Sequence, residues 1–332
     1  MNRKLASVRK ILELRPIDGA DLIELAIVDG WSVVVKKGEF NVDDLVVYFE
    51  IDSWIPHNLA PFLSKGKEPR EYKGIKGEKL RSIRLRGQLS QGLIIPLTPH
   101  LSNVEGEDLT EILGIIKWEK ELSAQLQGTA KGNFPGFIPK TDQERVQNLR
   151  KELSQSIGMT FEVTEKLEGS SMTVYMKDGE FGVCSRNLDL KDTEGNTFWE
   201  TAKALNLKAK FTMSNLDNIA FQGELIGPGI QGNIYKLDKH EWHVFDVYNI
   251  ATGRYLTPKE REFTVNTFWA NHVPIINSNF VLENSDIKEL LAMAEGKSML
   301  NLNTEREGIV FKSEDGKVSF KAVSNKYLLG IE

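Results

Sequence analysis

A lysine between two strand-like segments is the feature that most constrains how this chain can fold. Residues 161–171 read FEVTEKLEGSS, in which apolar and polar side chains first alternate, as in a half-buried strand, and a small-residue turn follows. Another strand-like run, 172–176, comes next, so Lys166 lies between two strands. It is flanked by Glu165 and Glu168, and the small residues 169–171 after it form a tight turn that leaves room for a phosphate. A lysine is a covalent nucleophile only when desolvation or a cationic neighbour removes its proton. Taken alone, the pattern also fits an exposed loop lysine.

The composition is that of a globular protein without a disulfide or Cys-rich metal framework. The chain has 332 residues, 40% hydrophobic and 27% charged, which allows two or three domains. Its net charge of −5 means that any nucleic-acid binding has to come from local patches. Cys184 is the single cysteine and the five histidines are scattered. No apolar run is long enough to span a membrane and the N-terminus lacks a signal-peptide core, so we expect an intracellular protein, cytoplasmic by default, with no membrane partner.

The first 125 residues predict a small β-domain. Strand-like runs separated by turn residues are expected at 7–14, 22–28, 31–36 and 44–50. The stretch 65–86 then carries nine Lys or Arg against three Glu, and its arginines alternate with Ile83 and Leu85. A small antiparallel domain with a basic hairpin fits an OB-type barrel that binds nucleic acid, which we expect at 1–125. A solvated charged loop explains the basic stretch equally well.

A Gly- and Pro-rich segment separates this part from a second domain. Residues 126–140 lack hydrophobic periodicity, which predicts a linker, and 141–332 follow as the second domain. Strands are expected there at 160–165, 172–177, 181–185, 219–226, 242–248, 308–312 and 317–321, and helices at 197–206, 258–270 and 286–294. Many strands with helices in groups predict an α+β fold with antiparallel sheets rather than a doubly wound one.

Two further helices are expected outside these runs. One covers 109–116 in the first domain. The other begins near Thr141 or Asp142, either of which can cap it, and carries apolar residues at 146, 149 and 153 on one face. In that helix Arg145 lies near the start on another face, where it is free to meet an anion.

Five short blocks of charged and aromatic residues follow one another in the second domain. They are KLEGSS (166–171), SRN (185–187), FQGELIG (221–227), HVFDVY (243–248) and REGIVFK (306–312), the last followed by SFKAV (319–323). Each has a structural explanation by itself, such as a solvent-facing edge carboxylate for Glu224 or a core ring for Phe245. In this order they resemble the covalent nucleotidyltransferase superfamily of ATP-dependent polynucleotide ligases and mRNA capping enzymes. The resemblance covers the second domain and is closest to nick-sealing RNA ligases, in which an OB domain comes first.

The resemblance implies an α+β nucleotidyltransferase fold, with ATP-grasp-like antiparallel sheets and helices, and a reaction in three steps. ATP adenylates Lys166, AMP passes to a 5′-phosphate, and a 3′-hydroxyl then displaces AMP. The implied catalytic residues are Lys166, Lys321 and Glu307. Glu307 is also the implied ligand of a magnesium or manganese ion. Two positions depart from the commonest pattern, because Glu168 replaces an aspartate and Ser319 stands where a second lysine is often found.

The same resemblance implies how the nucleotide is held. Arg186 and Glu224 bind the ribose hydroxyls and Phe245 stacks on the adenine. Backbone groups of Thr164 and Glu165 hydrogen-bond to the edge of the adenine. Lys140 and Arg145 contact the β- and γ-phosphates. The implied nucleotide-binding residues are Arg186, Glu224, Phe245, Thr164, Glu165, Glu168, Arg145 and Lys140.

The implied substrate is a nicked duplex with an RNA 3′-hydroxyl end, which points to RNA repair; no protein partner is evident.

Three alternative functions stay open. A capping-type RNA guanylyltransferase shares the lysine chemistry, and a DNA ligase is disfavoured by the domain order. The third alternative is a non-enzymatic nucleic-acid-binding module. It is disfavoured because such a module does not need carboxylate, lysine and aromatic residues in five blocks of fixed order.

Overall fold

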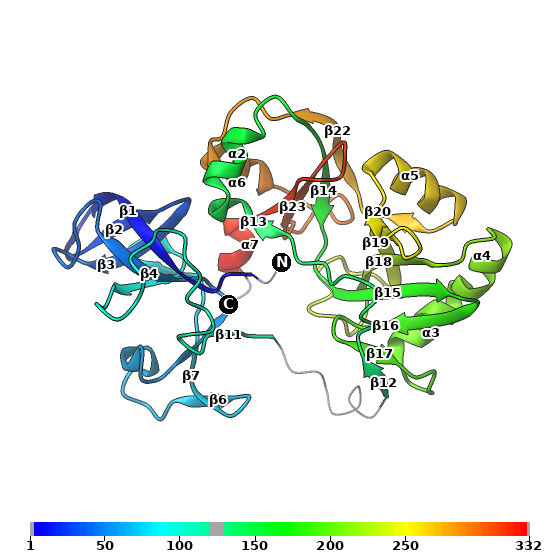
Figure 1. Ribbon diagram of the computed structural model, residues 1–332, viewed down its shortest axis with the longest axis horizontal. Helices are drawn as coiled ribbons and strands as arrows, with labels where there is room; N and C mark the ends of the chain where they lie inside the picture. Colours follow the sequence, from blue (N-terminus) through cyan, green and yellow to red (C-terminus); the bar gives the residue numbers. More distant parts are fainter. Residues whose placement is uncertain (1–2, 120–128, 331–332) are drawn as a thin grey trace. The chain divides into compact units, whose positions relative to one another are not determined.

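The computed structural model describes residues 3–119 and 129–330 and divides into two compact units (Figure 1). One comprises residues 1–121 with 329–332, and the other residues 122–328. The predicted limits of the domains and of the linker remain predictions. Part of the expected linker, β12 (Ala130–Asn133), is a strand that pairs with β17 (Leu188–Leu190) of the second unit. No helix in the described part of the chain is long and apolar enough to cross a membrane.

The first unit is built on a five-stranded antiparallel sheet. Its order is β10 (Leu93–Pro96), β4 (Leu45–Phe49), β1 (Ala6–Ile17), β2 (Ala20–Val28) and β3 (Trp31–Lys36). Trp31, Val33 and Val35 are buried at alternate positions of β3, as the period of a strand requires. The backbone N–H of Gln91, just before β10, donates to Ser32 of β3 at 2.8 Å. This bond joins the two edges of the sheet, as in a closed barrel.

Shorter elements complete the first unit. They are the sheet of β11 (Ile116–Lys117), β5 (Ser53–Pro56), β7 (Ile75–Lys79) and β6 (Arg70–Tyr72), the hairpin of β8 (Ile83–Leu85) and β9 (Gln88–Ser90), and the 3-10 turn η1 (Pro61–Ser64). The helix expected at 109–116 is wrong. The chain makes one turn, with Leu113 N–H bonded to Leu109 O, and Gly114 at φ +64° ends it before β11.

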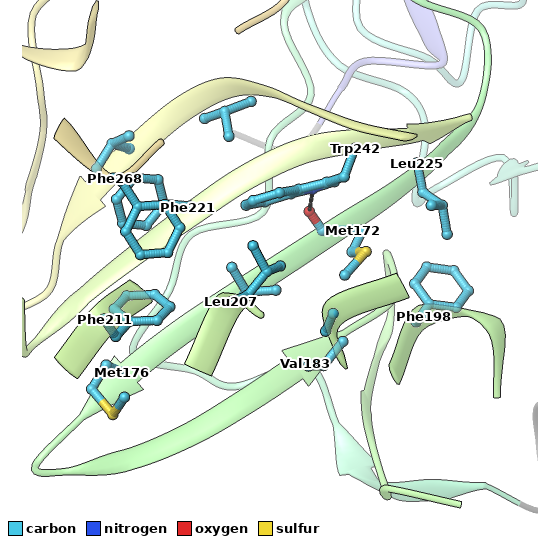
Figure 2. Packing of buried hydrophobic residues seen from close by; sticks show 14 of the residues in the cluster. Met172, Met176, Val183, Phe198, Leu207, Phe211, Phe221, Leu225, Trp242 and Phe268 are labelled. Atoms are coloured by element: carbon cyan, nitrogen blue, oxygen red, sulfur yellow. Dashed lines mark hydrogen bonds between the residues drawn. The ribbon is translucent and has the colours of Figure 1, made fainter. Parts of the chain in front are cut away.

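The second unit contains a large sheet covered on one face by helices. Its strands are β12, β17, β16 (Glu180–Cys184), β15 (Ser170–Lys177), β18 (Ile219–Ile226), β19 (Glu241–Asn249) and β20 (Arg254–Tyr255), with β21 (Asn271–His272) parallel to β19. The covering helices are α3 (Thr197–Ala204), α4 (Leu207–Met213) and α5 (Pro258–Thr267). Figure 2 shows Phe211, Phe221 and Phe268 packed together and a hydrogen bond between Trp242 and Met172. In this bond the Trp242 indole N–H donates to Met172 O at 3.1 Å. Since side chains alternate along β18, Glu224 projects from the opposite face, away from these three helices.

A smaller sheet lies in the same unit and carries Lys166. Its order is β13 (Glu144–Arg145), β24 (Ser319–Val323), β23 (Gly308–Ser313), β14 (Thr160–Lys166) and β22 (Ile275–Val281). The helical elements beside it are η2 (Val146–Asn148), α2 (Arg150–Gln155), α6 (Ile287–Ala294) and α7 (Asn325–Gly330). Phe161, Phe311 and Phe320 form a core on the face that α6 covers. The intervening residues of β14, β23 and β24 therefore face the other way, and the predicted α+β class is confirmed.

The helix expected from Thr141 or Asp142 starts later than predicted. Residues 144–145 are strand β13, which pairs in parallel with β24, and the α-helix begins only at Arg150. The residues after the expected cap therefore pair as a strand and do not start a helix. This pairing places Arg145 opposite Lys321 in the sheet. Arg145 is consequently buried rather than exposed at a helix start.

Buried ion pairs join the two sheets of the second unit. Lys312 of β23 pairs with Asp246 of β19 at 2.6 Å, and Arg261 of α5 pairs with Glu162 of β14. Arg261 also lies 3.9 Å from Asp246, and all four side chains are buried. Removing one partner of a buried pair costs about 3–5 kcal/mol, because the other charge is left uncompensated. The pairs therefore fix β14 and β23 relative to β19.

Candidate active site

Lys166 ends β14 and forms an ion pair with Glu307, which immediately precedes β23. Its Nζ lies 2.5 Å from Glu307 Oε1, and both side chains are only partly exposed. The pair follows from the register, since Lys166 lies opposite Gly308 in the β14–β23 ladder. Gly308 is needed there, because a Cβ on it would lie 2.3 Å from Ala322 O of β24. Two elements far apart in sequence thus bring one cation and one carboxylate together.

The turn after Lys166 packs against β18, and this brings two more carboxylates near the lysine. A Cβ on Gly169 would lie 2.4 Å from Leu225 O and 2.9 Å from Glu224 Cγ, so only glycine allows this approach. Burial raises the pKa of Glu224 to about 8; Lys166 acts in the opposite direction and Glu307 adds to the rise. Burial, and then repulsion from Glu307, also raise the pKa of Glu168. Glu168, Glu224 and Glu307 therefore form one acidic cluster around one lysine.

Two predicted cations from different sheets meet at Asp142. Lys321 Nζ of β24 lies 2.9 Å from Asp142 Oδ1, and Arg186 Nη2, which follows β16, lies 3.4 Å from Oδ2. Lys321 lies on the same face of the smaller sheet as Thr164 and Lys166, because it pairs with Val310 and Val310 pairs with Thr164. The structure thus brings Lys321 and Arg186 together, as two cations of one nucleotide site require.

Asp142 itself was missed by sequence reasoning, which treated it as a possible helix cap. No periodicity or motif spacing marks it, since its role comes from the path of the segment before β13. That segment is held by Pro139 O, which accepts from Gln222 Nε2 at 2.8 Å, and by Lys140 Nζ, which lies 2.9 Å from Asn187 Oδ1. The predicted Lys140 therefore lies beside the SRN block, whereas Arg145 lies beside Lys321.

Phe245 lies in an apolar cluster next to the nucleophile strand. It packs with Leu167, Ile226, Tyr235 and Val273, and its ring is partly exposed. A half-buried ring of this kind fits an adenine-stacking residue as well as a core one.

The two residues before Lys166 are buried in the β14 ladder. The N–H of Glu165 donates to Pro274 O at 2.8 Å, and its carboxylate Oε2 accepts from the N–H of Met299 at 2.8 Å. Burial raises the pKa of this carboxylate. Thr164 pairs with Ile275 of β22, so the backbone of both residues is engaged in the sheet.

Two tyrosines near the acidic cluster were also missed from the sequence. Tyr235 Oη accepts a hydrogen bond from the N–H of Glu168 at 2.6 Å, which fixes the turn after Lys166. Tyr327 of α7 lies close enough to Glu307 and Glu168 that both, after burial, raise its pKa. Both lie outside the five blocks, and only their aromatic character marks them in the sequence.

Comparison with known proteins decides the family. A family model described as RNA ligase matches residues 159–327, and a model described as an OB-fold domain matches residues 5–97. An apo mutant of Naegleria gruberi RNA ligase is 49% identical over 98% of this chain and 97% of that one, with a TM-score of 0.91.

This chain belongs to the RNA ligase family. The predicted enzyme class and the predicted N-terminal OB fold are confirmed. Mutants of the Naegleria gruberi RNA ligase with AMP and Mn (TM-score 0.91) and with ATP and Mn (TM-score 0.90) are 49% identical over 98% of each chain. No curated protein matches the chain.

The donor set of this RNA ligase fits a hard divalent cation held by few protein ligands. Among the described residues no group of three or more His, Cys, Asp or Glu is arranged to hold a metal ion. Glu307 nevertheless offers a carboxylate beside Lys166, and carboxylate oxygens are what magnesium and manganese prefer. Magnesium is commonly bound by one or two carboxylates together with water and substrate phosphates, which is the arrangement that these residues allow.

Proposed function

We propose that this RNA ligase seals 3′-hydroxyl/5′-phosphate nicks through an AMP bound covalently to Lys166, with ATP and a magnesium or manganese ion as cofactors. The observation that carries the proposal is the Lys166–Glu307 pair at the end of β14, within the acidic cluster and on the face that carries Lys321. Naegleria gruberi RNA ligase mutants with ATP or AMP and Mn support the choice of cofactors.

Lys166 supplies the nucleophile in the first step. Its ammonium first loses a proton to solvent; the amine then attacks the α-phosphorus of ATP, the N–P bond forms, and the bond to pyrophosphate breaks. Glu307 holds Nζ in place before the attack and is the proposed metal ligand; the metal ion supplies charge neutralisation at the phosphates. AMP then passes to the 5′-phosphate of the nick, and the 3′-hydroxyl displaces it to form the phosphodiester.

Lys321 neutralises the charge that grows on the α-phosphate. Its Nζ is already held by an anion, the carboxylate of Asp142, so the side chain points into a site that suits negative charge. Arg186 shares Asp142 and binds the ribose together with Glu224. Lys140 and Arg145 flank this position on the same segment, which supports their assignment to the β- and γ-phosphates.

Phe245 stacks on the adenine, a contact worth about 1–3 kcal/mol for base–aromatic pairs. Thr164 and Glu165 line the adenine edge from β14. Because the backbone of both residues is engaged in the sheet, the Glu165 carboxylate is the group of this pair that is left to accept from the base. Glu168 is the last of the proposed nucleotide-binding residues. It lies in the turn after Lys166, which the hydrogen bond from its N–H to Tyr235 Oη holds in place.

The proposed substrate is a duplex nick with an RNA 3′-hydroxyl end, and the proposed role is RNA repair in the cytoplasm. The OB-fold unit binds the nucleic acid. Sealing of four nicked duplexes, which differ only in whether each side of the nick is ribose or deoxyribose, tests the substrate. We expect sealing only where the 3′-hydroxyl side is RNA; sealing of an all-DNA nick at the same rate would contradict it.

The covalent step has its own test. After incubation with ATP and magnesium, intact-mass analysis should show the gain of one AMP on the wild-type chain and none on Lys166→Ala. GTP in place of ATP is the control for the guanylyltransferase alternative. An adduct on another side chain, or one formed equally with GTP, would overturn the proposal.

A further inference from the structure

The basic stretch of the first unit consists of two hairpins that differ in how their charges are used. In the β6–β7 hairpin, Arg70 pairs with Glu78 at 2.5 Å and Lys76 with Glu68 at 2.8 Å. Lys79 at the end of β7 pairs with Asp52 and lies 3.7 Å from the centroid of the Trp118 ring. Most cations of this hairpin are thus neutralised within the unit.

The β8–β9 hairpin presents its charges to solvent instead. Arg81, Arg84 and Arg86 are exposed, and none of them has an ion pair or hydrogen bond with any residue that the structure describes. The apolar side chains between them, Ile83 and Leu85, are 42% and 38% exposed. A strand with every side chain exposed buries too little surface to be retained for stability alone.

The base of the hairpin is nevertheless held firmly to the barrel. Ser90 Oγ accepts from the N–H of Val34 in β3 at 3.0 Å, and Gln91 donates through its backbone to Ser32 O at 2.8 Å. Ser82, Ser90 and Gln91 are buried, although they are polar. The hairpin is therefore a fixed projection of the barrel sheet.

Its tip carries an arginine in an unfavourable conformation. Arg86 has φ +47° and Gly87 φ +79°, as in a two-residue hairpin turn in which both central residues are left-handed. Asn or Asp is preferred at the first of these positions, because an L-residue with a long side chain is strained there. The β6–β7 hairpin turns in the same way at Lys73 (φ +49°) and Gly74 (φ +79°), so the number of unpaired charges, and not the turn, distinguishes the β8–β9 hairpin.

We propose that the β8–β9 hairpin is the element that grips the sugar-phosphate backbone of the nucleic-acid substrate, through Arg81, Arg84 and Arg86. An anion is the partner that three uncompensated guanidinium groups require, and phosphates spaced along a nucleic-acid strand match cations placed just before β8, within it and in the turn after it. The β6–β7 hairpin contributes less, since three of its four cations, Arg70, Lys76 and Lys79, are already paired. This inference rests on the proposed nick-sealing function.

The test compares two variants that lose the same charge. Arg84→Gln with Arg86→Gln removes two unpaired cations, and Arg70→Gln with Lys76→Gln removes two paired ones. Binding of a fluorescent nicked duplex is measured by anisotropy at several salt concentrations, with AMP-adduct formation as the measure of an intact second unit. For the Arg84/Arg86 variant we expect the slope of log K, the logarithm of the binding constant, against log[salt] to become shallower by about two. Its affinity for the duplex at low salt should fall roughly tenfold or more, and its adduct formation should not change.

The possible outcomes separate the hairpin from the enzyme. Wild-type-like binding by the Arg84/Arg86 variant, or an equal loss in the Arg70/Lys76 variant, overturns the proposal; the first result would leave Ile83 and Leu85 as a surface for a protein partner. A wild-type chain that binds the duplex through the hairpin but does not seal it contradicts the proposed function and not the hairpin. A wild-type chain that forms the adduct but does not bind the duplex overturns both.

Discussion

Lys312 donates a hydrogen bond from Nζ to the backbone oxygen of Phe245 at 2.6 Å, and the same Nζ lies 5.9 Å from the centroid of the Phe245 ring. Asp246, the next residue along β19, holds Lys312 at 2.6 Å from the other side. Burial lowers the pKa of Lys312 to about 8. The lysine that ends the REGIVFK block therefore fixes the residue that we assign to the adenine.

Phe245→Ala should raise the ATP concentration for half-maximal adduct formation by about 5–100-fold, the equivalent of roughly 1–3 kcal/mol of lost stacking. Titration of adduct yield against ATP measures this directly. Phe181→Ala, which removes a ring that packs on Trp199 and Phe211 under the helices, is the control for a general loss of packing. An ATP requirement that does not change in the Phe245 variant would make Phe245 a core residue only.

Glu224→Gln should stabilise the fold in the alkaline range. The folded-state pKa of Glu224 is about 8, against an ordinary value of 4.5, so the native state binds more protons than the unfolded state between these two values. Stability from this group is therefore present below about pH 4.5 and is lost as the pH rises towards 8. We expect the variant to gain on the order of 1–3 kcal/mol of unfolding free energy at pH 8 and almost none at pH 4.5.

Urea unfolding of both proteins at several pH values measures the difference. An equal gain at every pH would mean that the carboxylate is not the cause. The variant should also bind ribose more weakly, because the amide offers one acceptor oxygen where the carboxyl group that we assign to the hydroxyls offers two. A carboxylate that costs stability where it stands is a common property of active sites.

Asp142→Asn should tighten ATP binding, because the Asp142 carboxylate competes with the nucleotide phosphates for Lys321 and Arg186. We expect the half-saturating ATP concentration to fall roughly 3–10-fold, as is typical of removing one like charge from an anion site. Asp192→Asn, which removes a surface partner of Lys203, is the matched control. Weaker ATP binding in the Asp142 variant would mean that the carboxylate positions the two cations and does not compete.

The five blocks and many of the strands were predictable from the sequence because both signals are local, whereas β22 and β17 were not expected. Alternation along 31–36 predicted β3 with its observed bounds, and the order of the blocks singled out Lys166 and Glu307, which the structure places in one ion pair. Asp142 was not predictable in this way. Its contacts depend on where β13 joins β24 and on how Pro139 is held, and neither has a local signal. The short turn at 109–114 was mistaken for a helix because one helical turn has the same spacing as the start of a longer one.

Arg306 is a positioning residue for Glu307 and allows the sharpest test of the site. Its guanidinium donates to three successive carbonyls at the C-terminus of α6, those of Met293 at 2.8 Å, Ala294 at 3.1 Å and Glu295 at 2.6 Å. A cation there satisfies unpaired helix carbonyls and the helix dipole, so the backbone next to Glu307 is anchored to a fixed helix end. Arg306→Met should raise the magnesium concentration for half-maximal adduct formation by about tenfold, with Arg306→Lys in between.

A double-mutant cycle with Glu307→Gln separates this role from general stability. If Arg306 acts by holding Glu307, the double variant should form the adduct no more slowly than Glu307→Gln alone, because the carboxylate that Arg306 positions is already gone. Arg254→Met, which breaks a two-point ion pair with Glu260 at the start of α5, should leave the magnesium requirement unchanged. Additive losses in the double variant would show instead that Arg306 only supports the fold, because two independent defects multiply in rate whereas two defects in one contact do not.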